Sequence, residues 1–470
     1  MVLFLKSVNE FLWGTPLLCV LLGTHLYFTI RLGFIQKHTF HAIKLSVQSD
    51  TFSKSSNQIP PNSSSAKGTG FSGFGALATT LAATLGTGNI VGVSTAVYYG
   101  GPGAVFWCWI TGILGMATTY AECFLSVKYQ NKKYTDSKNN TDIETESEII
   151  ASKNVHFYYG GPMYVLKNGL HNKSLAGFYA FCVVISSFGA GCTTQSNALA
   201  ETAAYLWHLP TWLIGMITAV IVGFVLVAGF SSIEKFCMKL VPVMGALFFS
   251  TSVVILFLNY NYLWDGFSLI LSCAFSPKAI SSGFLGGTVG YSIKTAARYG
   301  IARGLFTNEA GLGTAGITAA GSTATPTIQA LISMTATFWD TVVCCAITGL
   351  VIVTNMLRFP ESVKGSSAGN LVNVAYDVIP YFGNVTLGVC MVLFAFATLI
   401  GWSYMGQQAF SYLFHQKGAK VYQTIYLVMI FIGAVMSLDL VWELTDTINF
   451  FMVIPNLIAL YGLRKEIEKP

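Results

Sequence analysis

Long apolar stretches alternate with short polar segments along almost the whole chain. A helix needs about 20 predominantly apolar residues to cross the hydrocarbon core of a bilayer, because it rises about 1.5 Å per residue. Stretches of this length recur throughout the sequence, and charged residues are concentrated between them. The pattern predicts eleven transmembrane helices, at about residues 10–33, 72–99, 103–129, 176–206, 211–229, 236–258, 279–298, 326–354, 383–413, 421–438 and 441–462.

Two longer polar segments interrupt this pattern. Residues 50–67 (DTFSKSSNQIPPNSSSAK) are rich in Ser, Pro and Asn, which predicts a flexible linker. Residues 130–154 mix charges of both signs and predict a solvated loop. We therefore expect residues 1–70 to form an extra N-terminal helix with a flexible cytoplasmic linker, and residues 71–470 to form one transmembrane core with a charged cytoplasmic loop at 130–154.

The distribution of Lys and Arg predicts the orientation of these helices. If the N-terminus is outside, eleven crossings place all but four of the 26 basic residues on the cytoplasmic side. Such an excess is typical of cytoplasmic loops. The sequence thus predicts a multi-pass protein of the cell membrane with its C-terminus in the cytoplasm. The four basic residues expected outside are Lys6, Lys278, Arg358 and Lys364.

Two of the predicted helices contain glycine-rich breaks. The second contains GTGNIVG at residues 86–92, and the seventh contains GFLGGTVG at residues 283–290. Each break lies in the first helix of a five-helix block, at about 72–258 and 279–462, and an odd number of crossings inverts one block relative to the other. Interrupted helices at matching positions of two halves indicate the central binding site of a transporter. The alternative is that these glycines only permit close helix packing.

Composition excludes several classes of protein. The chain is 53% hydrophobic and only 10% charged, whereas soluble proteins carry about 25% charged residues. The net charge of +6 does not indicate nucleic-acid binding, because the basic residues lie in short segments between apolar stretches. The ten cysteines form no C-x-x-C pair, and no nucleotide-binding or hydrolase motif is present, so we expect neither an enzyme nor a cofactor.

A broken helix supplies peptide groups that can bind a ligand. The free N–H groups at the start of a half-helix suit a carboxylate, and the free carbonyls at the end of the other half suit Na⁺ or an ammonium group. Thr87, Gly88 and Asn89 lie at the first break, where these ends would face a ligand.

Hydroxyl and amide side chains in other predicted helices could complete the site. Na⁺ takes several oxygen ligands, and the opened backbone at Gly86 could supply them together with Thr398 and Ser403 of the ninth helix. Each of these hydroxyls could instead bond to a carbonyl of its own helix. Gln195 and Asn197 could contact a ligand or join helices, because a buried amide is costly without a partner.

Few acidic residues lie within the predicted helices. Glu122, Asp340 and Glu201 are candidates for function on that ground, although none lies in a predicted break and Glu122 could pair with Lys128. A core without an ionised group favours a net-neutral ligand, because an unpaired buried ion is costly. A zwitterionic amino acid fits this condition.

Four stretches of the sequence resemble the alanine/glycine:cation symporter family, also called sodium:alanine symporters. They are LAATLGTGNIVGVSTAVYYGGPGAVFWCWITGILGMATTYAE (81–122), YYGGPMYVL (158–166), ARGLFTNEAGLGTA (302–315) and FAFATLIGWSYMGQQA (394–409). The resemblance implies an all-α fold of LeuT type, sodium coupling and transport of alanine, glycine or a similar small amino acid. The sequence after FTNEAGLGTA departs from the usual family pattern, which bears on substrate preference.

The resemblance also assigns roles to individual residues. It places Thr398 in a sodium site and Trp402 in a pocket wall, and it places Asn308 and Glu309 in an intracellular turn away from substrate. The substrate-binding residues that we expect are Thr87, Gly88, Asn89, Gln195, Phe284, Gly286, Gly287 and Trp402, with Na⁺ at Gly86, Thr398 and Ser403.

The sequence therefore predicts a carrier that imports a small neutral amino acid with Na⁺ by alternating access. An H⁺-coupled amino-acid carrier, a receptor that binds amino acids without transporting them, and a channel are the alternatives. The expected partners are the amino acid, Na⁺ and the lipid bilayer.

Overall fold

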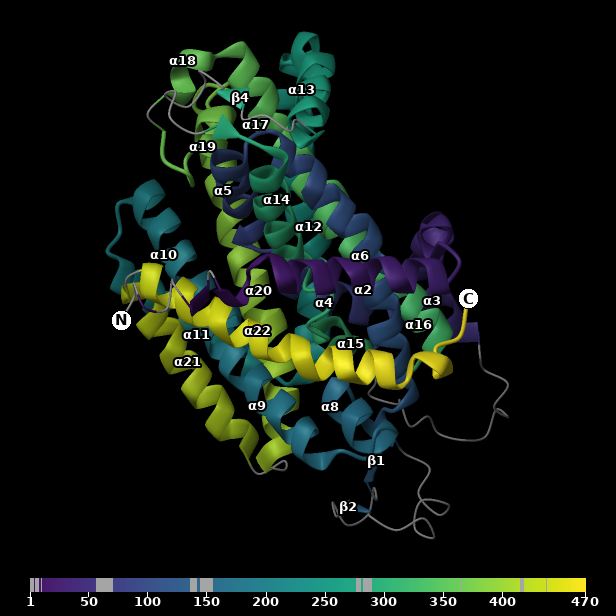
Figure 1. Cartoon of the computed structure of the whole chain (residues 1–470). Helices are drawn as coiled ribbons and strands as arrows, with labels where there is room; N and C mark the ends of the chain where they lie inside the picture. Colours follow the sequence, from purple (N-terminus) through teal and green to yellow (C-terminus); the bar gives the residue numbers. More distant parts are fainter. Residues whose placement is uncertain are drawn as a thin grey trace.

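The computed structural model is predominantly helical, with long helices crossing one another at a range of angles (Figure 1). It describes residues 4, 8–9, 11–55, 71–135, 142–143, 155–275, 280–281, 290–364, 366–414, 418–436 and 438–470.

Several of the helices are long and apolar enough to span a membrane. Among the described residues, five single helices meet this condition, and two pairs of helices, bent by 66° and 62°, meet it when each pair is taken together. These features identify a multi-pass membrane protein, as the hydropathy pattern predicts. The five single helices are Gly103–Lys128, Lys173–Ala204, Phe230–Leu258, Pro326–Arg358 and Phe382–Phe414.

Both bent pairs of helices lie in the first half of the chain. The elements before residue 130 are α2 (Thr15–Arg31), η1 (Ile35–His38), α3 (Thr39–Ser55), α4 (Gly73–Thr84), η2 (Thr87–Asn89), α5 (Val91–Gly100) and α6 (Gly103–Lys128). They are followed by β1 (Asn131–Thr135), β2 (Asp142–Ile143), β3 (Val155–Tyr159), α8 (Pro162–Tyr164), η3 (Val165–Gly169), α9 (Lys173–Phe188), η4 (Gly189–Thr193), α10 (Thr194–Trp207), α11 (Thr211–Val227) and α12 (Phe230–Leu258).

The second half begins with short elements and ends with long helices. Its first elements are η5 (Tyr260–Tyr262), α13 (Leu263–Phe275), β4 (Ile280–Ser281), β5 (Gly290–Tyr291), α14 (Ile293–Asn308), α15 (Thr314–Ala319), α16 (Pro326–Thr337) and η7 (Phe338–Cys345). The remaining elements are α17 (Ala346–Arg358), α18 (Pro360–Val363), α19 (Leu371–Tyr376), α20 (Phe382–Phe414), α21 (Ala419–Val435), α22 (Leu438–Gly462) and η9 (Arg464–Glu466).

Two small antiparallel sheets correct the prediction of a purely helical fold. The first has strand order β2-β1-β3, so part of the predicted loop at 130–154 is paired strand. The second pairs β4 with β5, where a helix over 279–298 was predicted. The helix there begins only at Ile293 and continues to Asn308. Likewise α3 extends to Ser55, into the predicted linker at 50–67.

Helix α6 lies at the centre of the molecule, packed against α2, α14, α15 and α16, while α20 packs against α4, α9, α10 and α12. At one of these contacts the two backbones nearly touch. A methyl group placed on Gly401 of α20 would lie 2.6 Å from the backbone nitrogen of Ala83 in α4. Only glycine allows this approach, which sets α20 directly against the end of α4.

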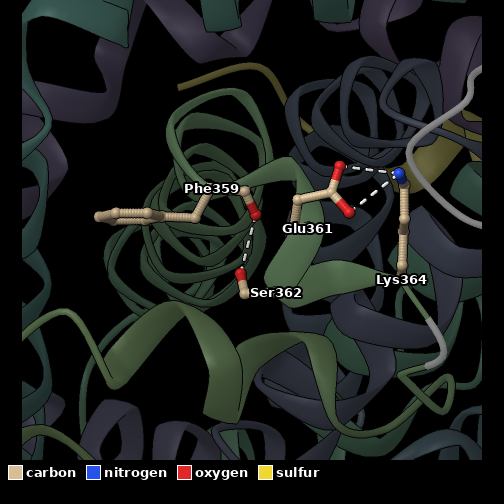
Figure 2. A network of polar contacts seen from close by, with 4 residues as sticks. All are labelled: Phe359, Glu361, Ser362 and Lys364. Atoms are coloured by element: carbon tan, nitrogen blue, oxygen red, sulfur yellow. Dashed lines mark hydrogen bonds and ion pairs between the residues drawn. The ribbon is translucent and has the colours of Figure 1, made fainter.

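A short exposed network follows α17. Lys364 binds both carboxylate oxygens of Glu361 at 2.7 and 3.0 Å, and the Ser362 hydroxyl donates to the Phe359 carbonyl at 2.8 Å (Figure 2). Exposed pairs of this kind contribute about 0–1 kcal/mol, so this one is a local feature of the surface.

Candidate functional site

The break in the second predicted helix is confirmed. Helix α4 ends at Thr84, Gly86 is extended with φ −126° and ψ −165°, and the chain bends by 62° before α5 begins at Val91. The Asn89 side-chain oxygen accepts the Gly86 N–H at 3.0 Å. The glycine break thus produces opened backbone, which is stable here because it is buried within protein.

Thr398 and Gln195 flank this opening from two other helices. The Thr398 hydroxyl donates to the Leu85 carbonyl at 3.3 Å and to the Phe394 carbonyl of its own helix at 3.0 Å. The Thr87 hydroxyl donates to the Gln195 side-chain oxygen at 3.2 Å. Three segments that are far apart in the sequence therefore meet at one break.

Asn89 lies in the break, and its side chain is bonded to neighbouring elements. Its amide nitrogen donates to the carboxylate of Asp340 at 2.6 Å, and the Thr341 hydroxyl donates to the other carboxylate oxygen at 2.7 Å. The Thr348 hydroxyl donates to the Asn89 carbonyl at 3.0 Å. Asn89 and Asp340 are fully buried, so this network holds η2 against the π-helical segment η7 and against α17.

A second opened segment lies at residues 309–313, between α14 and α15. Glu309, Gly311 and Gly313 all have positive φ, at 55°, 98° and 84°. The predicted break at 283–290, with Phe284, Gly286 and Gly287, falls almost entirely on residues that the structure does not describe and stays a prediction. The alternation of glycines in NEAGLG was the signal available for the observed opening, because glycine favours positive φ.

Buried polar side chains hold this second opening. The Gly311 N–H donates to the Glu122 carboxylate at 2.8 Å, and the Asn456 amide donates to that carboxylate at 2.6 Å and to the Gly311 carbonyl at 2.8 Å. Lys128 pairs with Glu466 at 3.1 Å, so the predicted pairing of Glu122 with Lys128 is wrong. Glu122 instead satisfies backbone that would otherwise be unpaired in the protein interior.

The two openings meet in a small cavity of about 30 Å³. Glu309 lies in its wall as well as in the turn that follows α14, where the resemblance places it. The Thr314 hydroxyl donates to the Glu309 carboxylate at 2.6 Å. The cavity is lined by Ala83, Thr84, Gly86, Gly88, Ala190, Gln195, Phe306, Thr307, Glu309, Thr398, Trp402 and Asn449.

The structure thus brings together some of the predicted site residues and separates others. Gly86, Gly88, Gln195, Thr398 and Trp402 share the cavity. The Thr87 and Asn89 side chains brace its wall, as described above. Those that lie elsewhere do so for identifiable reasons. The Ser403 hydroxyl donates to the carbonyl of Ile400 in its own helix at 2.6 Å, Asn197 joins α10 to the end of α21, and Glu201 lines a separate cavity with Asp377.

Comparison with known proteins is consistent with this architecture. An uncharacterized transporter of Haemophilus influenzae is 40% identical over 467 residues, covering 98% of this chain and 94% of its own. The sodium/alanine symporter AgcS of Methanococcus maripaludis is 39% identical over 461 residues, covering 97% and 93%.

The solved structure of MhsT in complex with L-phenylalanine aligns with a TM-score of 0.56 at 14% identity, covering 84% of this chain and 90% of that one. This likeness shows a LeuT-like transporter fold, whereas the number of spans and the inverted repeat stay predictions. The model of the sodium:alanine symporter family matches residues 1–140 and 149–469. The chain therefore belongs to the sodium:alanine symporter family.

Proposed function

We propose that this protein imports a small neutral amino acid, alanine or glycine, together with Na⁺ by alternating access. The similarity to AgcS and the family membership support this function. Trp402 and Phe306 line the cavity, whose volume of about 30 Å³ has room for little more than a water molecule. The cavity must therefore enlarge before an amino acid binds, and a short side chain requires the least enlargement.

The position of Glu309 in the wall of the cavity is the main support for this proposal. Among the described residues that line the cavity, it is the one acidic or basic side chain. An unpaired carboxylate buried in a membrane protein is costly, so a cation or a proton must accompany it. A zwitterion and Na⁺ bound beside Glu309 give a set of charges that sums to zero. The occupied site is neutral because Glu309 balances the charge of Na⁺, and not because acidic residues are missing.

The polar groups of the cavity suggest where each charge is bound. In the proposed arrangement the substrate ammonium pairs with Glu309, and its carboxylate faces the free N–H groups at the start of α5. Na⁺ is held by the Leu85 carbonyl and the Thr398 hydroxyl, which lie 3.3 Å apart at the end of α4. The negative end of the α4 dipole favours a cation at this position.

Coupling follows from the shared position of the two ligands. Na⁺ bound at the end of α4 would fix the opened backbone that contacts the substrate carboxylate. Sodium would then raise the affinity for the amino acid, and the amino acid would raise the affinity for sodium by the same factor. In this proposal the N-terminus is outside and the C-terminus cytoplasmic.

Uptake by purified protein in liposomes tests this function. Labelled alanine should accumulate when Na⁺ is present outside and K⁺ inside, and unlabelled glycine should compete. The membrane potential is clamped in all conditions. Alanine uptake that is the same with an inward Na⁺ gradient, with Na⁺ on both sides and without Na⁺ would refute sodium coupling. Ion flux far above the rate of alanine uptake would favour a channel, and saturable binding without uptake would favour a receptor.

A second candidate is an H⁺-coupled carrier. Glu122, Glu309 and Asp340 are all buried, and each is held by hydrogen bonds from neutral groups. A carboxylate in that environment can be neutralised by a proton instead of a metal ion. Uptake driven by an inward pH gradient in the absence of Na⁺ would favour this candidate over sodium symport.

A further inference from the structure

A separate cavity with basic and apolar walls lies at the C-terminal end of α2. It has a volume of about 420 Å³ and is lined by Tyr27, Ile30 and Arg31 of α2 and by Ile467 and Lys469 of the C-terminal tail. Helices α2 and α22 run beside each other, and the tail follows α22 (Figure 1). The cavity is therefore built by an element outside the predicted repeats and by the end of the chain.

Contacts on both sides fix the walls of this cavity. The Thr24 and Tyr461 hydroxyls are hydrogen-bonded at 3.0 Å, and Arg31 donates to the Arg464 carbonyl. In the tail, the Glu468 carbonyl accepts the Tyr120 hydroxyl at 3.0 Å, and Ile467 is 95% buried, with 5% of its surface exposed. The cavity is a fixed feature of the fold rather than a gap between mobile ends.

The charges that line the cavity are positive. Arg31 has a buried Nε atom with no hydrogen-bond partner, and Lys469 has no ion pair among the described residues. One of the two acids of the tail, Glu466, is already bound. The Tyr129 hydroxyl at 2.6 Å and the Lys128 ammonium at 3.1 Å lower the pKa of that carboxyl. Glu468 remains as an exposed acid beside the two basic residues.

The other walls are apolar and continue along α2. Ile30 is 59% exposed, and Val20 and Leu26 of the same helix are exposed at 52% and 47%. Arg31 is the last residue of this apolar helix, at the boundary with the cytoplasm that the distribution of Lys and Arg predicts. Tyr27, whose ring centroid lies 5.4 Å from that of Tyr461, is typical of that boundary.

We propose that this cavity binds an anionic phospholipid, with the headgroup phosphate on Arg31 and Lys469 and the acyl chains along Ile30 and α2. Arginine presents several N–H groups in a fork that fits phosphate oxygens, and the unpartnered Nε would be satisfied by this contact. Basic cavities beside transmembrane helices bind anionic headgroups for the same reason. The lipid would join α2 to the C-terminal tail. This inference does not depend on the transported substrate.

Thermal unfolding of the full-length protein in neutral detergent tests the proposal. Dioleoylphosphatidylglycerol should raise the melting temperature saturably, whereas dioleoylphosphatidylcholine and inorganic phosphate should not. The double variant R31Q/K469Q should weaken the apparent affinity for phosphatidylglycerol about 30-fold, since each charge contributes about fivefold. If R31Q impairs folding, K469Q alone should still weaken it about fivefold, because Lys469 is exposed.

A matched control distinguishes this site from diffuse charge. Lys235 and Lys420 are exposed, lie outside the cavity and are predicted to be on the same side of the membrane. The variant K235Q/K420Q removes the same charge and should bind phosphatidylglycerol like the wild type. An equal loss of affinity in this control would overturn the proposal. So would stabilisation of the wild type by inorganic phosphate alone, or no stabilisation by phosphatidylglycerol.

Discussion

The side-chain amide of Asn89 lies 2.6 Å from a carboxylate oxygen of Asp340, and both residues are fully buried. The same Asn89 accepts the Gly86 N–H through its side-chain oxygen. A single side chain thus connects the opened backbone of the first break to an acidic residue in η7. The shape of the break depends on a contact between residues 251 positions apart.

Replacing Asn89 with Ala should destabilise the protein and weaken alanine binding. The change leaves the buried Asp340 carboxylate without one of its donors and the Gly86 N–H without its acceptor. Each lost partner costs about 1–3 kcal/mol. Thermal unfolding and alanine binding measure the two effects, and Thr386→Ala, which removes an exposed hydroxyl bonded within its own helix, is the control.

A double-mutant cycle makes this prediction specific. If the contact is energetically real, N89A/D340A should destabilise by clearly less than the sum of the two single variants, because residues in one network are not additive. Additive effects would mean that the two residues act independently.

Replacing Glu309 with Gln should raise the dissociation constant for alanine at least tenfold. The variant keeps a polar side chain of similar size but removes the charge proposed to pair with the ammonium group. Hydrogen bonds to charged groups contribute about 1.5–3 kcal/mol, consistent with this loss. Glu361→Gln removes an exposed carboxylate that pairs with Lys364 (Figure 2) and should bind alanine like the wild type. Unchanged affinity in Glu309→Gln would mean that the residue is protonated during binding, which favours the H⁺-coupled carrier.

Replacing Thr398 with Val should raise the Na⁺ concentration needed for half-maximal uptake about fivefold, from the loss of about 1 kcal/mol of interaction. The shape of the side chain is nearly unchanged, but the oxygen beside the Leu85 carbonyl is removed. Thr354→Val is a matched control, because that buried hydroxyl donates only to carbonyls of its own helix, Leu350 and Val351. A similar shift in both variants would argue against a sodium site at Thr398.

The break at 86–92 could be predicted from the sequence, whereas the opening at 309–313 was missed for a physical reason. GTGN interrupts a helix that is otherwise apolar, so its glycines stand out against a clear transmembrane pattern. The helix before NEAGLG contains Lys294, Arg298 and Arg303. These basic residues predict a segment outside the membrane. A hydropathy pattern identifies helices whose surface can face lipid. Much of α14 is instead packed against α5 and α6. A helix that protein rather than lipid surrounds does not need to be apolar.

The polar network around the cavity could not be predicted from the sequence either. Glu122 was identified as a buried acid from its neighbours in the sequence, but its contact with Gly311 joins residues 189 positions apart. A single sequence gives the periodicity within a helix and no information about which helices meet. Gly86 and Trp402, which both line the cavity, lie in motifs that resemble a known family.

Replacing Gly401 with Ala should destabilise the protein by about 1–3 kcal/mol, the usual cost of overpacking. The added methyl group would lie 2.6 Å from the nitrogen of Ala83 and 2.8 Å from its Cα, and backbone atoms cannot move aside as a flexible side chain can. If α20 moved away from α4 to relieve the clash, Thr398 would also move away from Leu85. The Na⁺ concentration needed for half-maximal uptake should then increase. Gly245→Ala in α12 is the control, because nothing lies within 4 Å of the new methyl group. That variant should unfold at the wild-type temperature or slightly above it, because alanine is more favourable than glycine within a helix by up to about 1 kcal/mol. If both variants unfolded at the wild-type temperature, α4 and α20 would not be in the close contact on which the proposed sodium site depends.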